Sequence, residues 1–135
     1  MTDDDVVALG WATVDLERAA TDHRASLGPA ASFASASRSE LLGARCLAVH
    51  TIPGTSVAGR TMPGWLVLLE PDTEGRLAGY LARYGEGWAA TWLAPSPSGT
   101  TRNARPGPFG LERLMSEKAL HGAFRLRLVA ATIES

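Results

Sequence analysis

The sequence has 135 residues, with 13 basic and 14 acidic side chains and a net charge of −1. This length allows one compact hydrophobic core and is too short for two ordinary domains, so we expect a single domain over residues 1–135. The balanced charge argues against binding to nucleic acid, because domains that bind a phosphate backbone are clearly basic. Cys46 is the only cysteine, which excludes an internal disulfide and a zinc site built from several cysteines.

The N-terminal residues and the hydropathy of the chain bear on its location. The first residues, MTDDD, are acidic where a secretory signal peptide is basic. No apolar run approaches the length of about 18 residues that a membrane-spanning helix needs. Together with a single cysteine, which fits a reducing compartment, these features predict a cytoplasmic protein that does not cross a membrane.

The first part of the sequence predicts a strand followed by a helix. Residues 6–14 (VVALGWATV) are rich in strand-forming side chains. Asp15 can cap the next segment, because its carboxylate can accept a hydrogen bond from a free helical N–H group. Apolar side chains then recur at helical spacing over residues 16–27, and Gly28 with Pro29 ends the pattern. We therefore expect a helix over residues 16–27.

Three further strands are expected before the middle of the chain. Residues 31–37 show a weak strand pattern, and residues 41–50 and 65–70 show stronger ones. Proline and glycine punctuate residues 51–64, which predicts a loop there. The order of the elements up to residue 70 is therefore β-α-β-β-β.

A second helix is predicted after Pro71, with Asp72 or Thr73 as its cap. Its apolar side chains at positions i, i+3, i+4 and i+7 are Leu77, Tyr80, Leu81 and Tyr84. The glycine turn at residues 85–87 (GEG) ends this helix. We interpret Glu86 as a structural carboxylate of that turn.

The last third of the sequence predicts three strands and one long loop. Strand patterns cover residues 88–93, 109–115 and 123–131. Residues 94–110 are rich in proline, glycine, serine and threonine, which predicts a loop. Because of its length, this loop is a candidate lid.

Three stretches of the sequence resemble a known family. They are residues 7–19 (VALGWATVDLERA), residues 68–87 (LLEPDTEGRLAGYLARYGEG) and residues 121–122 (HG). In this order they resemble the vicinal oxygen chelate superfamily, particularly its methylmalonyl-CoA epimerase and glyoxalase-like members. The resemblance implies an α+β fold of paired β-α-β-β-β modules, whose curled mixed sheet surrounds a cleft. The first module would span about residues 5–71, and an abbreviated second module about residues 72–132.

The resemblance also implies where a divalent metal ion would bind. Metal-dependent members place one ligand on each of four strands around the cleft. The matching positions here are Ala8, Val67, Ala90 and either Leu126 or Arg127. None of these side chains can bind a metal ion as required. We therefore expect no metal ion and no other cofactor.

Strand parity predicts which side chains line the cleft, because residues two apart on a strand share a face. Small side chains on the first strand would then face three tryptophans on two other strands. The predicted lining residues are Ala8, Gly10, Trp65, Val67, Trp88, Ala90 and Trp92. Such a pocket suits a flat, largely apolar ligand held by stacking. The alternative is that the tryptophans fill the volume left by a lost metal site.

Polar side chains provide candidates for ligand binding and proton transfer. Arg45 and Arg102 could bind an anionic or carbonyl group through the guanidinium. His50, Glu70 and His121 lie near predicted strand ends, which border clefts, and are the candidate catalytic acids or bases. For each of these five residues the alternative is an ordinary structural or solvent-exposed role.

Three classes of function follow from these features. The first, which we favour, is a metal-independent protein that binds a small molecule, similar to members of the family that sequester antibiotics. The second is a metal-free isomerase, epimerase, lyase or cyclase of small-molecule (secondary) metabolism that uses histidine or glutamate as acid and base. The third is a partner protein with a filled cleft. Because a shortened second module would expose strand edges, we also expect a homodimer.

Overall fold

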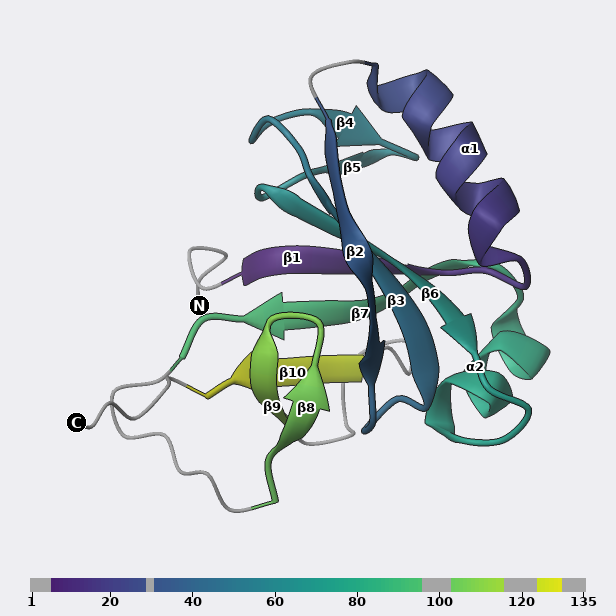
Figure 1. Cartoon of the computed structure of the whole chain (residues 1–135), viewed down its shortest axis with the longest axis vertical. Coiled ribbons are helices and arrows are strands. Elements are labelled where there is room, and N and C mark those ends of the chain that lie inside the picture. Colours follow the sequence, from purple (N-terminus) through teal and green to yellow (C-terminus); the bar gives the residue numbers. More distant parts are fainter. Residues whose placement is uncertain (1–5, 29–30, 96–102, 116–123, 130–135) are drawn as a thin grey trace.

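The computed structural model describes residues 6–28, 31–95, 103–115 and 124–129 (Figure 1). Within these ranges no helix is long and apolar enough to cross a membrane. The elements in chain order are β1 (Val6–Ala12), α1 (Leu16–Leu27), β2 (Ser32–Ser39), β3 (Ala44–His50), β4 (Ser56–Val57), β5 (Arg60–Thr61), β6 (Trp65–Pro71), α2 (Arg76–Tyr84), β7 (Gly87–Leu93), β8 (Arg105–Gly107), β9 (Gly110–Leu114) and β10 (Phe124–Leu128).

The described strands form a mixed eight-stranded sheet in the order β2-β3-β6-β1-β7-β10-β9-β8. The sheet has two equivalent halves. In the first half β1 pairs parallel with β6, and in the second β7 pairs parallel with β10, while the other pairs within each half are antiparallel. The two halves join through the antiparallel pair β1–β7. This arrangement confirms the α+β fold of paired modules with a curled mixed sheet.

The sheet curls until its two edge strands, β2 and β8, lie beside one another (Figure 1). One backbone hydrogen bond links these edges, from the Glu40 N–H to the Pro106 carbonyl at 3.1 Å. The curl gives the sheet a concave inner face and a convex outer face. Helix α1 packs on the outer face against β3 and β6, and α2 contacts β6 and β7.

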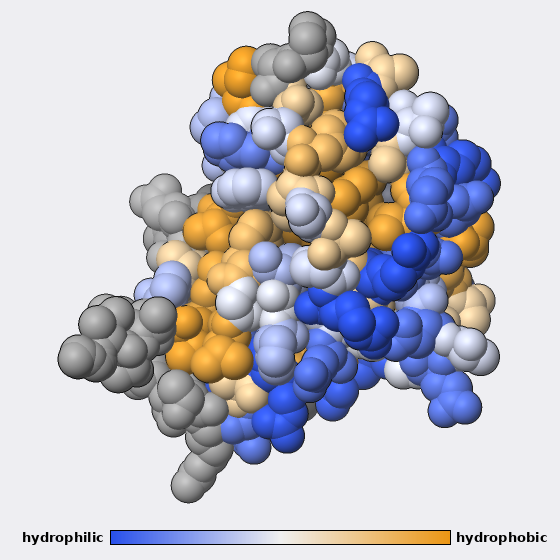
Figure 2. Space-filling model, viewed as in Figure 1, coloured by the Kyte–Doolittle hydropathy of each residue, from blue (hydrophilic) through white to orange (hydrophobic). Residues whose placement is uncertain are grey.

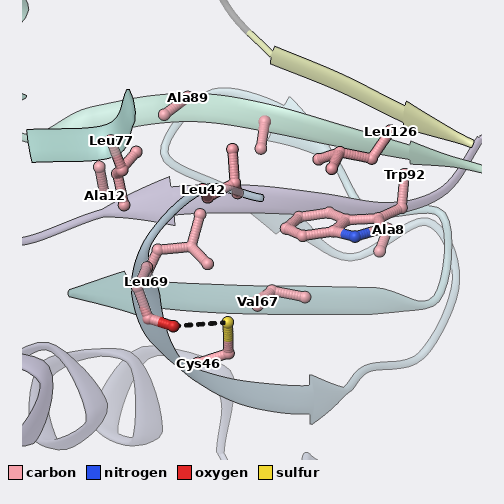
Figure 3. Packing of buried hydrophobic residues seen from close by; sticks show 12 residues of the cluster. Ala8, Ala12, Leu42, Cys46, Val67, Leu69, Leu77, Ala89, Trp92 and Leu126 are labelled. Atoms are coloured by element: carbon pink, nitrogen blue, oxygen red, sulfur yellow. Dashed lines mark hydrogen bonds between the residues drawn. The ribbon is translucent and has the colours of Figure 1, made fainter. Parts of the chain in front are cut away.

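Buried apolar side chains form two clusters, one on each face of the sheet. The inner cluster contains small residues of β1 and larger ones of β6, β7 and β10 (Figure 3). The outer cluster joins Leu16, Ala19 and Ala20 of α1 to Leu66 and Leu68 of β6. Successive side chains of β6 belong alternately to the inner and the outer cluster, because neighbouring residues of a strand point to opposite faces. Both faces of this central strand are therefore buried.

Helix α1 begins and ends where the sequence predicts. The Asp15 side chain accepts a hydrogen bond from the Arg18 N–H at 3.1 Å, and Gly28 ends the helix with a positive φ of 80°. Helix α2 differs from the prediction, because its N-terminal cap is Gly75 and neither predicted residue caps it. The Asp72 carboxylate is instead paired with the Arg38 guanidinium through two hydrogen bonds of 2.6 and 3.1 Å.

Several strand boundaries also differ from the prediction. Residues 41–43 form a turn, so β3 begins three residues later than expected. The predicted loop 51–64 contains the short hairpin β4–β5, and the predicted loop 94–110 contains β8. Strand β8 was missed because Pro106 and Gly107 are unusual in strands, and an edge strand tolerates a proline that a central strand would not. The candidate lid includes residues 96–102, which lie outside the described residues.

Glu86, predicted to be a structural carboxylate, joins the turn before β7 to the turn after β1. Its Oε2 atom accepts hydrogen bonds from the Thr13 hydroxyl, the Val14 N–H and the Arg18 guanidinium at 2.7–2.9 Å. These interactions, led by the Val14 N–H, lower the pKa of Glu86. We expect Glu86→Gln to destabilise the protein at neutral pH by about 0.5–1 kcal/mol, measured by urea unfolding. An unchanged urea midpoint would contradict this role.

Candidate functional site

Of the positions at which the resemblance implies metal ligands, Ala8, Val67, Ala90 and Leu126 lie in the inner cluster. Arg127, the alternative to Leu126, donates a hydrogen bond to the Ala94 carbonyl. Ala8, Val67 and Leu126 have no exposed surface, and Ala90 is 4% exposed. In Figure 3 Val67 and Leu126 lie on opposite sides of the Trp92 indole. These side chains carry no metal-binding atom, and no group of three His, Cys, Asp or Glu residues within the described ranges could hold an ion. The residues present therefore do not fit a divalent metal ion.

Trp92 fills the centre of the inner face. Its side chain is fully buried and lies directly over Gly10 of β1. A Cβ atom at position 10 would approach Trp92 Cζ3 to 2.7 Å and Ala90 Cβ to 3.1 Å. The absence of a side chain at position 10 is therefore needed for this indole to pack, and the inner face is occupied here by protein.

Glu112 of β9 is a fully buried carboxyl group on the same inner face. Its Oε1 atom accepts a hydrogen bond from Trp92 Nε1 at 2.8 Å, and its Oε2 atom accepts one from the Ser39 hydroxyl at 2.7 Å. Ser39 ends β2, so these bonds connect β2 of the first half of the sheet with β7 and β9 of the second. Neither Glu112 nor Ser39 was predicted from the sequence as a site residue.

Burial raises the pKa of Glu112, because removal from water disfavours the charged carboxylate. The hydrogen bonds from Ser39 and Trp92 oppose this effect without cancelling it. The Cys46 thiol is also buried. Its pKa is raised to about 12, mainly by burial and to a smaller extent by the charge of Glu112. Cys46 is therefore an uncharged thiol at neutral pH, and burial makes Glu112 harder to ionise than a carboxyl group in water.

Gly107 of β8 gives the Glu112 carboxyl group its space. A Cβ atom at position 107 would lie 2.0 Å from Glu112 Oε1 and 2.2 Å from its Cδ. Both distances are far below a van der Waals contact, so any larger residue at position 107 would displace the carboxyl group. The backbone of β8 thus packs directly against the Glu112 carboxyl group.

Three aromatic rings extend from Trp92 toward the surface. Phe109, in the two-residue turn between β8 and β9, lies edge-on to Trp92 and to Trp65, with ring centroids 6.0 and 5.5 Å apart. The His50 ring follows at 4.6 Å from Trp65. Because Trp65 and Phe109 are only partly buried, this aromatic row connects the inner face with solvent. We call Trp65, Phe109 and Trp92 the aromatic row below.

Trp88, which parity assigns to the cleft, lies instead on the outer face. The register of β7 against β1 shifts between the pairs Gly10–Ala90 and Trp11–Trp88, so Ala89 is an extra residue in β7. This bulge moves Trp88 to the side of Trp11, with ring centroids 5.1 Å apart. The bulge therefore breaks the simple alternation on which the prediction depended.

The predicted polar residues are dispersed. Arg45 pairs with Glu70, and also with Glu17 of α1 at 3.3 Å, on the outer surface of the sheet. Neither Arg45 nor Glu70 therefore reaches the inner cluster. His50 is exposed beside Trp65, at the solvent end of the aromatic row. The other two candidates, Arg102 and His121, lie outside the described residues.

Two equivalent four-stranded halves join through their first strands into one curled sheet, with α1 on the outer face and α2 packed on the inner cluster through Leu77. This is the glyoxalase-like fold. The chain resembles methylmalonyl-CoA epimerase from Streptomyces coelicolor in complex with 2-nitronate-propionyl-CoA: the TM-score is 0.71 at 22% identity, over 95% of this chain and 98% of that one. The corresponding values for the Mycobacterium tuberculosis epimerase are 0.70, 17%, 95% and 89%.

A protein from Bacillus halodurans has the same fold, with a TM-score of 0.67 and 13% identity over 96% of both chains. No protein-family model matches the sequence, and a comparison with curated proteins gave no significant match. At identities of 13–22% these likenesses concern the fold. They agree with the resemblance noted in the sequence.

Proposed function

We propose that this protein binds a flat, largely apolar small molecule at the inner face of its sheet, without a metal ion. The observation that carries the proposal is the aromatic row, which leads from solvent to a buried carboxyl group. Aromatic rings hold flat ligands by stacking, and one polar group can then fix the orientation of the ligand. Apolar side chains at all four positions implied for metal ligands support binding that does not depend on an ion.

The similar structures support a small molecule as the ligand. The Streptomyces coelicolor enzyme was solved with 2-nitronate-propionyl-CoA, and an epimerase of the same fold was solved with methylmalonyl-CoA. Proteins of this fold therefore bind small organic molecules.

A metal-free isomerase, epimerase, lyase or cyclase is the second candidate function, and Glu112 is the observation that favours it. A general base works best when its pKa lies near the working pH, and burial shifts the pKa of Glu112 in that direction. Glu70 is held in ion pairing with Arg45 on the outer surface. Of the described candidates for acid–base chemistry, Glu112 is thus better placed than Glu70.

Tryptophan fluorescence tests the proposed binding function. Titration with planar aromatic metabolites and acyl-CoA thioesters should identify a compound that quenches the emission. Trp65→Leu should weaken binding of that compound at least about tenfold, because an aromatic anchor is lost. Trp88→Leu is the matched control and should bind it normally, since Trp88 lies on the outer face.

The opposite pattern, with binding lost in Trp88→Leu and retained in Trp65→Leu, would contradict the proposed location. No quenching by any compound would contradict the proposed function. If the bound compound is converted to a product, detected by mass spectrometry, the second candidate function is correct, and Glu112→Gln should abolish the conversion.

We also propose that the protein is a homodimer in solution. The strand edges that motivated this expectation lie beside one another in the single chain, so edge pairing no longer supports it. Closure of the aromatic row by a second chain is the remaining physical reason. Sedimentation equilibrium at micromolar concentration should give twice the chain mass of 14.2 kDa. A single-chain mass would exclude the dimer.

A further inference from the structure

We propose that the ligand carries a positively charged nitrogen, which binds at the partly exposed rings of the aromatic row, Trp65 and Phe109, and is attracted by the buried Glu112 carboxylate. The inference rests on the proposed function, because it specifies the chemical class of the molecule bound at the same site.

Glu112 differs from the paired acidic side chains in its surroundings. Glu17, Glu70, Asp72 and Glu86 each pair with an arginine at the surface. Glu112 is fully buried, and within the described residues it forms hydrogen bonds with two neutral donors and no ion pair. Burying a carboxylate without a counter-charge is costly. A cationic group of a ligand would supply that missing charge.

The aromatic row adds a second attraction for a cation. The face of an aromatic ring is electrically negative, so it attracts a positive nitrogen, and most strongly where water is excluded. Trp92 connects these rings to the carboxyl group, because its N–H donates to Glu112 while its ring packs against Phe109. An anionic ligand would be repelled by Glu112, and a neutral one would gain stacking alone.

One hairpin provides both interactions. Phe109 forms its tip, and Glu112 follows three residues later on β9. Gly107 and Gly110 pair across this tip, and Gly110 has a positive φ of 109°. The partly exposed Phe109 ring is therefore the point at which a ligand would meet the row, and Trp92 links this ring to Glu112.

A matched pair of probes tests the inference. 1-Methylquinolinium is a permanent cation, and quinoline is a neutral ring of nearly the same shape at pH 8. Isothermal titration calorimetry with the full chain should show that 1-methylquinolinium binds at least about tenfold more tightly. Glu112→Gln should abolish this preference while quinoline binding persists. The exposed Glu17→Gln is the control and should retain the preference.

Each other outcome overturns a defined part of the account. Equal affinity for both probes would contradict the proposal that the ligand is a cation. A preference for 1-methylquinolinium that persists in Glu112→Gln would also contradict it. In both cases the proposed binding function would remain supported. Absence of binding by both probes at millimolar concentration would contradict both proposals. If Glu112→Gln does not fold, Phe109→Leu replaces it and should weaken 1-methylquinolinium binding more than quinoline binding; equal weakening would overturn the inference.

Discussion

Gly107→Ala is expected to destabilise the protein by about 2–4 kcal/mol. The added Cβ atom would lie 2.0 Å from Glu112 Oε1, so the carboxyl group would have to leave its place. It would then lose its hydrogen bonds with Ser39 and Trp92, and two buried donors would lose their acceptor. Urea unfolding followed by far-UV circular dichroism measures the loss.

A double-mutant cycle separates this contact from a general effect of alanine on β8. Glu112→Ala removes the carboxyl group, so Gly107→Ala should cost at most about 1 kcal/mol in that background. Gly79→Ala is the matched control, because an added Cβ at position 79 of α2 meets no atom within 4 Å. It should be neutral or slightly stabilising. An equal cost of Gly107→Ala in both backgrounds would contradict the contact.

Glu112→Gln is expected to stabilise the protein at pH 8, by about 1–2 kcal/mol or about 3–6 °C in Tm. Glutamine has the same shape, and its amide can accept from Trp92 and donate to Ser39. The folded state holds the Glu112 proton more tightly than the unfolded state, because burial raises the pKa above its ordinary value of 4.5. Stability of the natural protein therefore falls as the pH rises from 4.5 through the raised pKa.

The glutamine variant lacks this titration, so its advantage should be present at pH 8 and shrink toward pH 4.5. Glu86→Gln should behave in the opposite way. Because hydrogen bonds lower the pKa of Glu86, that residue stabilises the fold above its ordinary pKa, and the contribution is lost as the pH falls through the lowered value. Calorimetric Tm values of both variants from pH 4 to pH 8 test the two signs. A lower Tm of Glu112→Gln at pH 8 would mean that the carboxylate stabilises the fold.

A carboxyl group that costs stability in the interior needs another explanation for its presence. Binding and catalysis provide one, since functional sites hold polar groups in surroundings that disfavour them. Glu112 meets this description through its burial, its raised pKa and its neutral partners. The stability measurement and the probe titration therefore examine the same residue in two independent ways.

Local patterns in the sequence predicted much of the fold. Helix α1 begins after Asp15 and ends before Gly28. Both signals are local, because the Asp15 side chain caps the first turn and Gly28 adopts a positive φ. The predicted strand over residues 65–70 is confirmed as β6, whose apolar run is typical of a strand buried on both faces. The order of the paired modules came from the resemblance, because the pairing of distant strands leaves no local pattern.

The candidate site was harder to predict, and Trp88 and Glu112 show why. The bulge at Ala89 reverses the face of Trp88, and nothing in the local alternation of residues 88–93 indicates an extra residue. Glu112 and Arg113 are adjacent charged residues in β9, so alternation alone does not decide which one faces inward. Leu111 and Leu114 stand on opposite faces of the strand, so the sequence does not show that the face of Leu114 and Glu112 is the buried one.

Native mass spectrometry of protein purified without chelators tests the central claim most directly, because one spectrum reports bound metal ions and bound organic molecules together. The claim is that the inner face binds an organic molecule beside Glu112 and does so without an ion. We expect a metal-free protein that carries one organic adduct per chain, and an adduct lost in Trp65→Leu. A stoichiometric divalent metal ion in the natural protein would contradict the account.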